Sequence, residues 1–224
     1  IEMIRAAACN YWSQGIDGLY LAHWFGNWPY KASFYEKLRE LPHPDVMAPK
    51  DKIYSIPTET GRYPKPPTEP GTAMQLPATL KKGEPVKVKL PISDDLSRWR
   101  KVGRIHQVLL RIRIMSTTER DRLSFRLNGK ELPADQLRKI NELYRMQAPR
   151  YRTGSGYWFV FDLESSHWPR KGNNVLEVEL QRRDRQAIPT IYIRDVELEI
   201  KYLMGKNYNR GQDADLGPYE HSGM

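Results

Sequence analysis

The chain has 224 residues, of which 39% are hydrophobic, and its formal net charge is +9 at pH 7. This composition is polar but holds enough apolar residues for a core, which excludes a wholly disordered chain. No apolar run reaches the roughly 20 residues of a membrane-spanning helix, so we expect no membrane partner. The single cysteine, Cys9, excludes an internal disulfide and says little about the compartment.

The excess of basic residues permits a polyanionic partner, because Lys and Arg attract phosphate and sulfate groups. The basic residues are spread along the chain, however, and carboxylates lie between them. The sequence contains no recognition helix, zinc-finger spacing or RNA-binding aromatic signature. We therefore interpret the charge as a solvated basic surface and expect no nucleic-acid partner.

Residues 1–41 predict a helix, a buried strand and a second helix. The first helix is expected over residues 2–14, with Gly15 as its C-terminal cap. Its expected apolar face consists of Ile4, Ala7, Ala8 and Tyr11. Residues 19–25 are apolar on both faces, which is typical of a covered parallel strand, and residues 32–41 predict another helix. Because no second unit of this kind follows, we interpret 1–41 as the last piece of a larger α/β domain. The alternative is a small α-hairpin with an odd strand.

Residues 42–79 are rich in Pro, Thr, Gly and Lys, which predicts an extended linker that runs over the surface. Tyr54, Ile56 and Tyr63 are its expected anchors.

Residues 80–204 show period-two alternation of apolar side chains, which predicts six to eight antiparallel strands. The clearest are expected at 86–92, 106–115, 123–127, 157–163, 176–181 and 191–202. Asn128-Gly129 is a preferred type I′ hairpin pair, and a β-bulge near Arg194-Asp195 would absorb a change of phase. A short helix is expected over 135–146. The pattern predicts a mainly β fold, an antiparallel β-sandwich, with residues 205–224 as a tail.

The run from Arg5 to Leu21 resembles the last helix–strand step of the TIM-barrel glycoside hydrolases, in which an alanine-rich helix ends in G-x-D-G before an apolar eighth strand. The resemblance implies an N-terminal α/β remnant of a (β/α)8 barrel, with the missing barrel portion of the same protein as a partner. It places three candidate sugar contacts at the active-site end of the strand: His23, Trp24 and Trp28. Nothing acidic lies at that end, so we assign no catalytic residue to this chain.

Residues 84–203 resemble the galactose-binding-like jelly rolls that follow catalytic domains. The resemblance is carried by Asp94-Asp95-Leu96, by the strand that ends in Asn128-Gly129, and by Gly172-Asn173-Asn174. It implies a structural module or one that binds a polysaccharide or oligosaccharide. The candidate contacts are Trp158 and Tyr151, with Trp99, Arg152, Tyr157 and Trp168 as further pieces, and ordinary packing is the alternative for each.

Asp94, Asp95 and Asp121 could ligate a structural calcium ion, but no ordered acidic spacing supports such a site, so we expect no metal and no cofactor.

Three function classes follow from the sequence. The first is a non-catalytic C-terminal segment of a glycoside hydrolase, secreted or periplasmic, whose jelly roll supports the barrel or binds carbohydrate. The second is a stand-alone enzyme, which no nucleophile elbow, phosphate loop or metal spacing supports. The third is a basic β-sandwich that binds polyanions or a protein partner. We expect the first.

Overall fold

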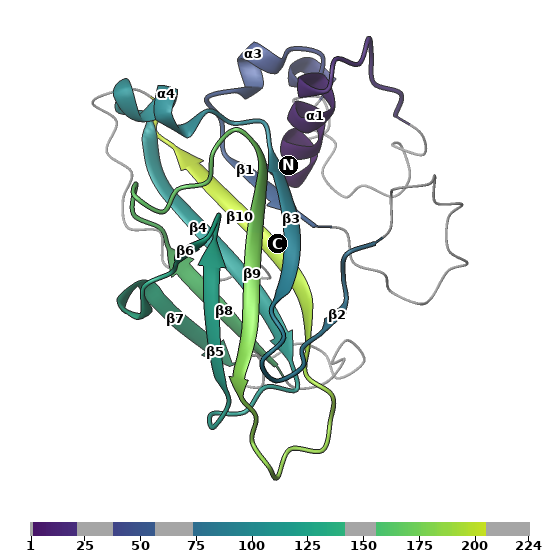
Figure 1. Cartoon of the computed structure of the whole chain (residues 1–224). Helices are drawn as coiled ribbons and strands as arrows, with labels where there is room; N and C mark the ends of the chain where they lie inside the picture. Colours follow the sequence, from purple (N-terminus) through teal and green to yellow (C-terminus); the bar gives the residue numbers. More distant parts are fainter. Residues whose placement is uncertain (1, 22–37, 57–73, 142–155, 205–224) are drawn as a thin grey trace.

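The computed structural model describes residues 2–21, 38–56, 74–141 and 156–204, and in these parts the chain is mainly β (Figure 1). Two antiparallel sheets face each other, and the side chains between them form the main core. Helix α1 (Glu2–Ser13) lies beside one end of this arrangement, next to β1 (Figure 1). The architecture confirms the predicted antiparallel β-sandwich at this coarse level.

The six-stranded sheet has the order β1-β10-β4-β8-β7, and β2 also pairs with β10. Its strands are β1 (Lys52–Ser55), β2 (Ala78–Thr79), β4 (Ile105–Met115), β7 (Leu137–Asn141), β8 (Gly156–Asp162) and β10 (Tyr192–Tyr202). The four-stranded sheet has the order β3-β9-β5-β6. Its strands are β3 (Val86–Ile92), β5 (Arg122–Leu127), β6 (Lys130–Glu131) and β9 (Gly172–Arg182). Short helices α3 (Pro44–Met47) and α4 (Leu96–Lys101) complete the described elements.

The core forms because alternate residues of each strand point between the sheets. Phe125 of β5 meets Phe159 and Phe161 of β8 across the sandwich, with ring centroids 5.2 Å apart in both pairs. In β10 the register shifts between Ile193 and Asp195, so residues of both parities reach the same core. This shift confirms the predicted bulge.

The hairpin between β5 and β6 also follows the prediction. Asn128 and Gly129 have φ angles of 53° and 80°, and a type I′ turn requires positive values at both positions. Asn tolerates this left-handed conformation better than other side chains, and Gly adopts it without a Cβ penalty.

The described part of residues 42–79 departs from the expected extended linker. Within it, β1 pairs with β10 along four residues, and Tyr54 and Ile56 lie in the main core. Met47 is fully buried beneath α1, and Leu76 is 1% exposed. Of the three expected anchors, Tyr54 lies in β1, Ile56 follows this strand, and Tyr63 lies outside the described residues. The strand forms because β10 otherwise presents an unpaired edge.

The predicted helix at 135–146 is wrong over its described part. A 3-10 turn at Ala134–Gln136 leads into β7, which pairs with β8 from Leu137↔Phe161 to Asn141↔Tyr157. Leu137 packs against the main core, whereas Ile140 packs on the opposite face of the sheet. The open edge of β8 supplies backbone partners that outweigh the helical spacing of these apolar residues. Residues 142–146 lie outside the described parts.

Helix α1 confirms the predicted helix, and Gly15 ends it with a φ of 82°. Its buried face differs from the predicted one, because Tyr11 is 52% exposed. The buried side chains are Arg5, Ala6, Ala8 and Cys9. Residues 19–21 form no strand, and Tyr20 is 93% exposed, so this part of the expected covered strand is wrong. Its remainder, residues 22–25, and residues 32–37 lie outside the described parts.

Candidate functional site

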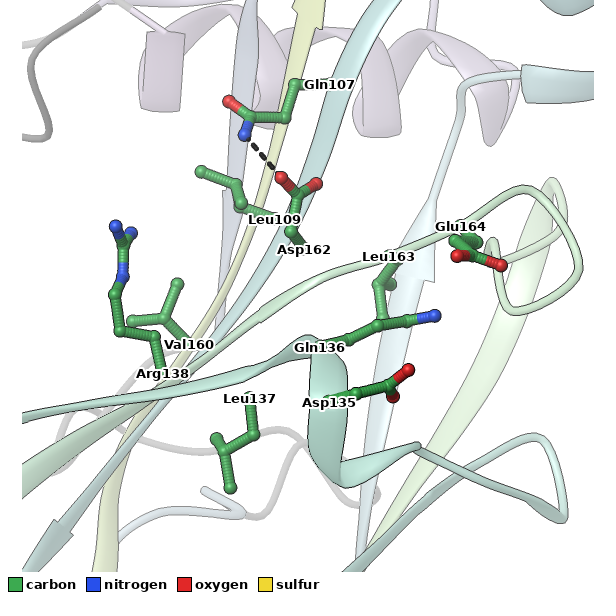
Figure 2. A pocket seen from close by; sticks show the side chains of 10 residues that line it. All are labelled: Gln107, Leu109, Asp135, Gln136, Leu137, Arg138, Val160, Asp162, Leu163 and Glu164. Carbon is green, nitrogen blue, oxygen red and sulfur yellow. Dashed lines mark hydrogen bonds between the residues drawn. The ribbon is translucent and has the colours of Figure 1, made fainter.

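A pocket lies on the outer face of the six-stranded sheet, where β4 and β8 meet the segment that leads into β7 (Figure 2). Its volume is about 560 Å³, which is in the range of small-molecule sites. It is lined by Gln107, Leu109, Asp135, Gln136, Leu137, Arg138, Val160, Asp162, Leu163 and Glu164. These residues come from three segments of the chain that only the folded sheet brings together.

The floor of the pocket is apolar. Leu109 and Val160 are 4% and 3% exposed and form a cluster with Trp158, against which Ile140 packs. The guanidinium carbon of Arg113 lies 5.8 Å from the centroid of the Trp158 ring. Trp158 is 2% exposed, so it supports the floor rather than presenting its ring to a ligand. Trp158, which was a predicted sugar contact, therefore lies beside the pocket. Its ring packs against other side chains, which was the alternative interpretation for this residue.

The walls of the pocket are polar and rich in hydrogen-bond acceptors. Gln107 Nε2 donates a hydrogen bond of 2.8 Å to Asp162 Oδ2, and Arg138 lies on the other side of Val160 (Figure 2). Asp135 and Glu164 add two exposed carboxylates. Three carboxylates and one guanidinium line the pocket, so its net charge is 1 − 3 = −2 on a chain of +9.

Gln136 adds a further polar feature to the pocket. Its Oε1 atom is buried and has no hydrogen-bond partner in the described structure. A buried amide oxygen without a donor costs on the order of 1–3 kcal/mol, which a bound water would recover.

The remaining predicted sugar contacts are distributed elsewhere. His23, Trp24, Trp28 and Tyr151 lie outside the described residues, and so does Arg152. Trp99 and Trp168 are partly buried against the main core, and Trp168 Nε1 donates to the Leu163 carbonyl at 2.7 Å. Tyr157 donates to Glu119 Oε1 at 2.6 Å.

A second group of polar residues is buried between the two sheets near α1. Lys52 and Asp94 are 0% and 4% exposed, and Lys52 Nζ lies 3.1 Å from Asp94 Oδ1. The ammonium also donates to the carbonyls of Ala48, at 2.9 Å, and Lys50, at 3.1 Å. It lies 5.0 Å from the centroid of the Tyr202 ring. With three acceptors for three protons, Lys52 is satisfied as a cation, which indicates a structural ion pair.

Burial has the largest effect on the pKa values of the titratable side chains in this region. It raises the pKa of Asp94 although the Lys52 ammonium acts to lower it. Burial also raises the pKa of Tyr54, whose hydroxyl lies 2.8 Å from Ser93 Oγ. The nearby Cys9 thiol has its pKa raised to about 11, again mainly by burial. A thiol of this kind is a poor nucleophile at neutral pH, because almost none of it is thiolate.

Helix α1 is fixed to the sandwich by a network of ion pairs. Arg5 Nε donates to Glu40 Oε1 at 2.9 Å, and Lys50 Nζ donates to Glu40 Oε2 at 2.7 Å. Arg5 also donates to the Asp51 carbonyl. Burial acts to raise the pKa of Glu40, but the hydrogen bonds from Lys50 and Arg5 outweigh it and lower the pKa. The carboxylate therefore stays charged and holds the helix.

A ladder of charges follows β4 and β10 on the outer face of the six-stranded sheet. Arg111 pairs with Glu199, and Arg113 Nη1 lies 3.2 Å from Asp195 Oδ2. Glu197 lies opposite Arg111 in the register and is 8% exposed. Burial raises the pKa of Glu197 to about 7, against the attraction of Arg111.

Two further observations concern metal and membrane sites. Within the described residues, no three His, Cys, Asp or Glu side chains gather in a way that would hold a metal ion. Asp95 instead caps α4 by accepting from Arg98 N at 3.0 Å, and Asp121 lies 2.6 Å from Arg183. No described helix combines the length and apolar character that crossing a membrane requires.

The chain matches no protein-family model, and no curated protein matches it either.

The residues that form the pocket were missed at the level of the sequence. Asp162 continues the outward parity of Trp158 and Val160, and Gln107 has the outward parity of Leu109, so alternation carried a signal for both. Asp135, Gln136 and Arg138 were missed because residues 135–146 were predicted to form a helix. A helix there would not have placed these residues at the edge of β8.

Proposed function

We propose that this chain is a non-catalytic β-sandwich of the jelly-roll kind that binds an uncharged oligosaccharide in the pocket on the six-stranded sheet. The observation that carries the proposal is the combination of an apolar floor, Leu109 and Val160, with acceptor-rich walls that include Asp162 and Gln136. A sugar ring has the matching surfaces, because it presents C–H groups on one face and hydroxyl groups at its rim.

The hydrogen-bonding capacity of the walls suits hydroxyl groups. Gln107 already occupies one oxygen of Asp162, which fixes the carboxylate and leaves its other oxygen to accept from a ligand. Gln136 also lines the pocket, with its Oε1 atom buried and unpartnered. Arg138 supplies donors on the opposite side of the pocket (Figure 2). Donors and acceptors on both sides of an apolar floor fix the orientation of a sugar ring.

The role as support for a glycoside-hydrolase barrel forms the second part of the proposal. It rests on the alanine-rich helix that ends before Gly15-Ile16-Asp17-Gly18, without the strand expected at residues 19–21, and the docking of α1 adds to it. Arg5, Glu40 and Lys50 fix α1 next to β1, so a domain that includes α1 would be held rigidly at the β1 edge of the sandwich. The buried acids Asp94 and Asp121 pair with cations, which fits a supporting role better than acid–base catalysis.

Calorimetric titration with neutral xylo-, cello- and galacto-oligosaccharides tests the binding site. We expect the Asp162→Ala variant to bind its best ligand at least tenfold more weakly, because one hydrogen bond to a charged group contributes roughly 1.5–3 kcal/mol. Asp45→Ala is the matched control, since this carboxylate is exposed on α3 and lines no part of the pocket. No binding of any neutral sugar at millimolar concentration, or an equal loss in the control, would contradict the proposal.

A further inference from the structure

A cluster of basic side chains lies where α4 meets the loop between β8 and β9, and we call it the basic end. It consists of Arg98, Arg100, Lys101, Arg104, Arg170 and Lys171. Five of them are exposed, and Arg104 is partly buried. The guanidinium carbon of Arg100 lies 6.0 Å from the ring centroid of Trp168, which joins the two segments. Figure 1 shows α4 and the start of β9 at the same end of the sandwich.

Six cations without acidic partners gather at the basic end. None of its six cations forms an ion pair with a carboxylate anywhere in the described structure. Elsewhere, cations such as Arg113 and Arg183 lie within 3.2 Å of carboxylates. Asp95 adjoins the cluster but caps α4, accepting from a backbone N–H. With one adjoining carboxylate, Asp95, for six cations, this end keeps a concentrated net positive charge.

Two tryptophans hold the guanidinium groups in place. Trp99 has the guanidinium carbons of Arg98 and Arg104 at 5.2 and 5.9 Å from its ring centroid. Trp168 carries Arg100 and is itself fixed by its hydrogen bond to Leu163. Cation–π contacts of this kind limit the rotamers of long side chains, so less conformational entropy is lost when a ligand binds.

We propose that the basic end binds the anionic groups of an acidic polysaccharide, as a second site that does not depend on the pocket. The planar guanidinium fork matches a sulfate or carboxylate with two hydrogen bonds, and Lys101 and Lys171 add unpaired ammonium groups. Proteins that bind single-stranded nucleic acids combine a basic groove with open aromatic faces on which the bases stack. Here arginines lie over Trp99 and Trp168, so the surface offers charge rather than a stacking platform.

The test compares two triple variants with the same loss of charge. Arg98→Gln/Arg100→Gln/Lys101→Gln removes half of the basic end. Lys82→Gln/Lys87→Gln/Lys89→Gln is the control, because these three lysines are exposed on and beside β3. The probes are a heparin octasaccharide, an oligogalacturonide and a single-stranded DNA of equal charge, each titrated at 50 and 200 mM salt. Unchanged thermal unfolding shows that both variants are folded, and Arg170→Gln/Lys171→Gln tests the same surface without altering α4.

We expect the α4 variant to bind the acidic glycans at least tenfold more weakly and the control less than twofold. Because each neutralised anion releases about one counterion, the slope of log K against log salt becomes less steep by roughly two to three in the α4 variant. Tighter heparin binding identifies sulfate as the preferred group, and tighter galacturonide binding identifies carboxylate. Equal losses in both triples, no glycan binding at 50 mM salt, or tighter binding of DNA than of either glycan would overturn the proposal.

Discussion

The buried ammonium of Lys52 gives the sharpest test of what holds the fold together. The substitution Lys52→Met keeps most of the aliphatic stem but removes the charge that pairs with Asp94 at 3.1 Å. It also leaves the carbonyls of Ala48 and Lys50 without their donor. Removing one partner of a buried ion pair typically costs about 3–5 kcal/mol, because the other charge stays buried and unpaired. For a chain of this size that corresponds to a fall in Tm of about 6–20 °C.

The pH dependence of this loss has a defined sign. Burial raises the pKa of Asp94 in the folded state, and Lys52 is the charge that acts most strongly to lower it. In the Lys52→Met variant this pKa therefore rises further above its unfolded value. A carboxyl group whose pKa is higher in the folded state does not change the free energy of unfolding at pH values below its unfolded pKa. Its destabilising effect grows as pH rises from the unfolded pKa to the folded pKa. We expect the deficit to be larger at pH 7.5 than at pH 4.5.

Urea unfolding followed by tryptophan fluorescence measures these quantities at both pH values. The double variant Lys52→Met/Asp94→Leu removes both charges, so we expect it to lose less stability than the sum of the single variants. Lys81→Met is the control, because this side chain is 71% exposed and its ion pair with Glu84 is expected to contribute less than about 1 kcal/mol. A loss below about 1 kcal/mol for Lys52→Met, or strict additivity in the double variant, would refute the reasoning.

Three further substitutions probe other buried groups. Glu197→Gln is expected to leave the free energy of unfolding unchanged near pH 4.5 and to raise it by on the order of 1–3 kcal/mol at pH 8, as measured by chemical denaturation. The reason is that a folded pKa of about 7 makes the charged carboxylate unfavourable in the folded state. Asn174→Ala should cost about 2–3 kcal/mol in the same assay, whereas the exposed Asn173→Ala should change stability by less than about 0.5 kcal/mol. Arg5→Met should release α1 and speed alkylation of Cys9, whose thiol is expected to react slowly in the native chain.

Local chemistry explains which features of the fold could be predicted from the sequence. The alternation of β8, the Asn128-Gly129 hairpin and the bulge before Asp195 each depend on residues close together in the chain. Asn174 is an intermediate case, because its neighbourhood predicted a turn but not its hydrogen bonds. Its amide binds backbone groups of Arg170, Gly172 and Leu90 and also Asn128, and the last two lie 84 and 46 positions away.

Features that depend on distant partners could not be predicted in this way. Arg5 lies on the buried face of α1 because Glu40, 35 positions away, receives its guanidinium, and no periodicity rule places an arginine there. The same holds for the pocket. Gln107 and Asp162 are 55 positions apart and meet only after β4 and β8 pair. Alternation predicts that both point outward, but the choice of neighbouring strand determines which outward residues share a pocket.

The two proposed sites carry opposite charges, and this difference makes them separable in one chain. An anionic glycan is repelled by the pocket, with its net charge of −2, and attracted by the six cations of the basic end. A neutral sugar in the pocket exchanges no counterions, so its affinity should hardly change between 50 and 200 mM salt, whereas acidic glycan affinity should fall steeply. If both ligands showed the same salt dependence, or if each displaced the other, a single site would account for both, and the assignment to separate ends of the sandwich would be wrong.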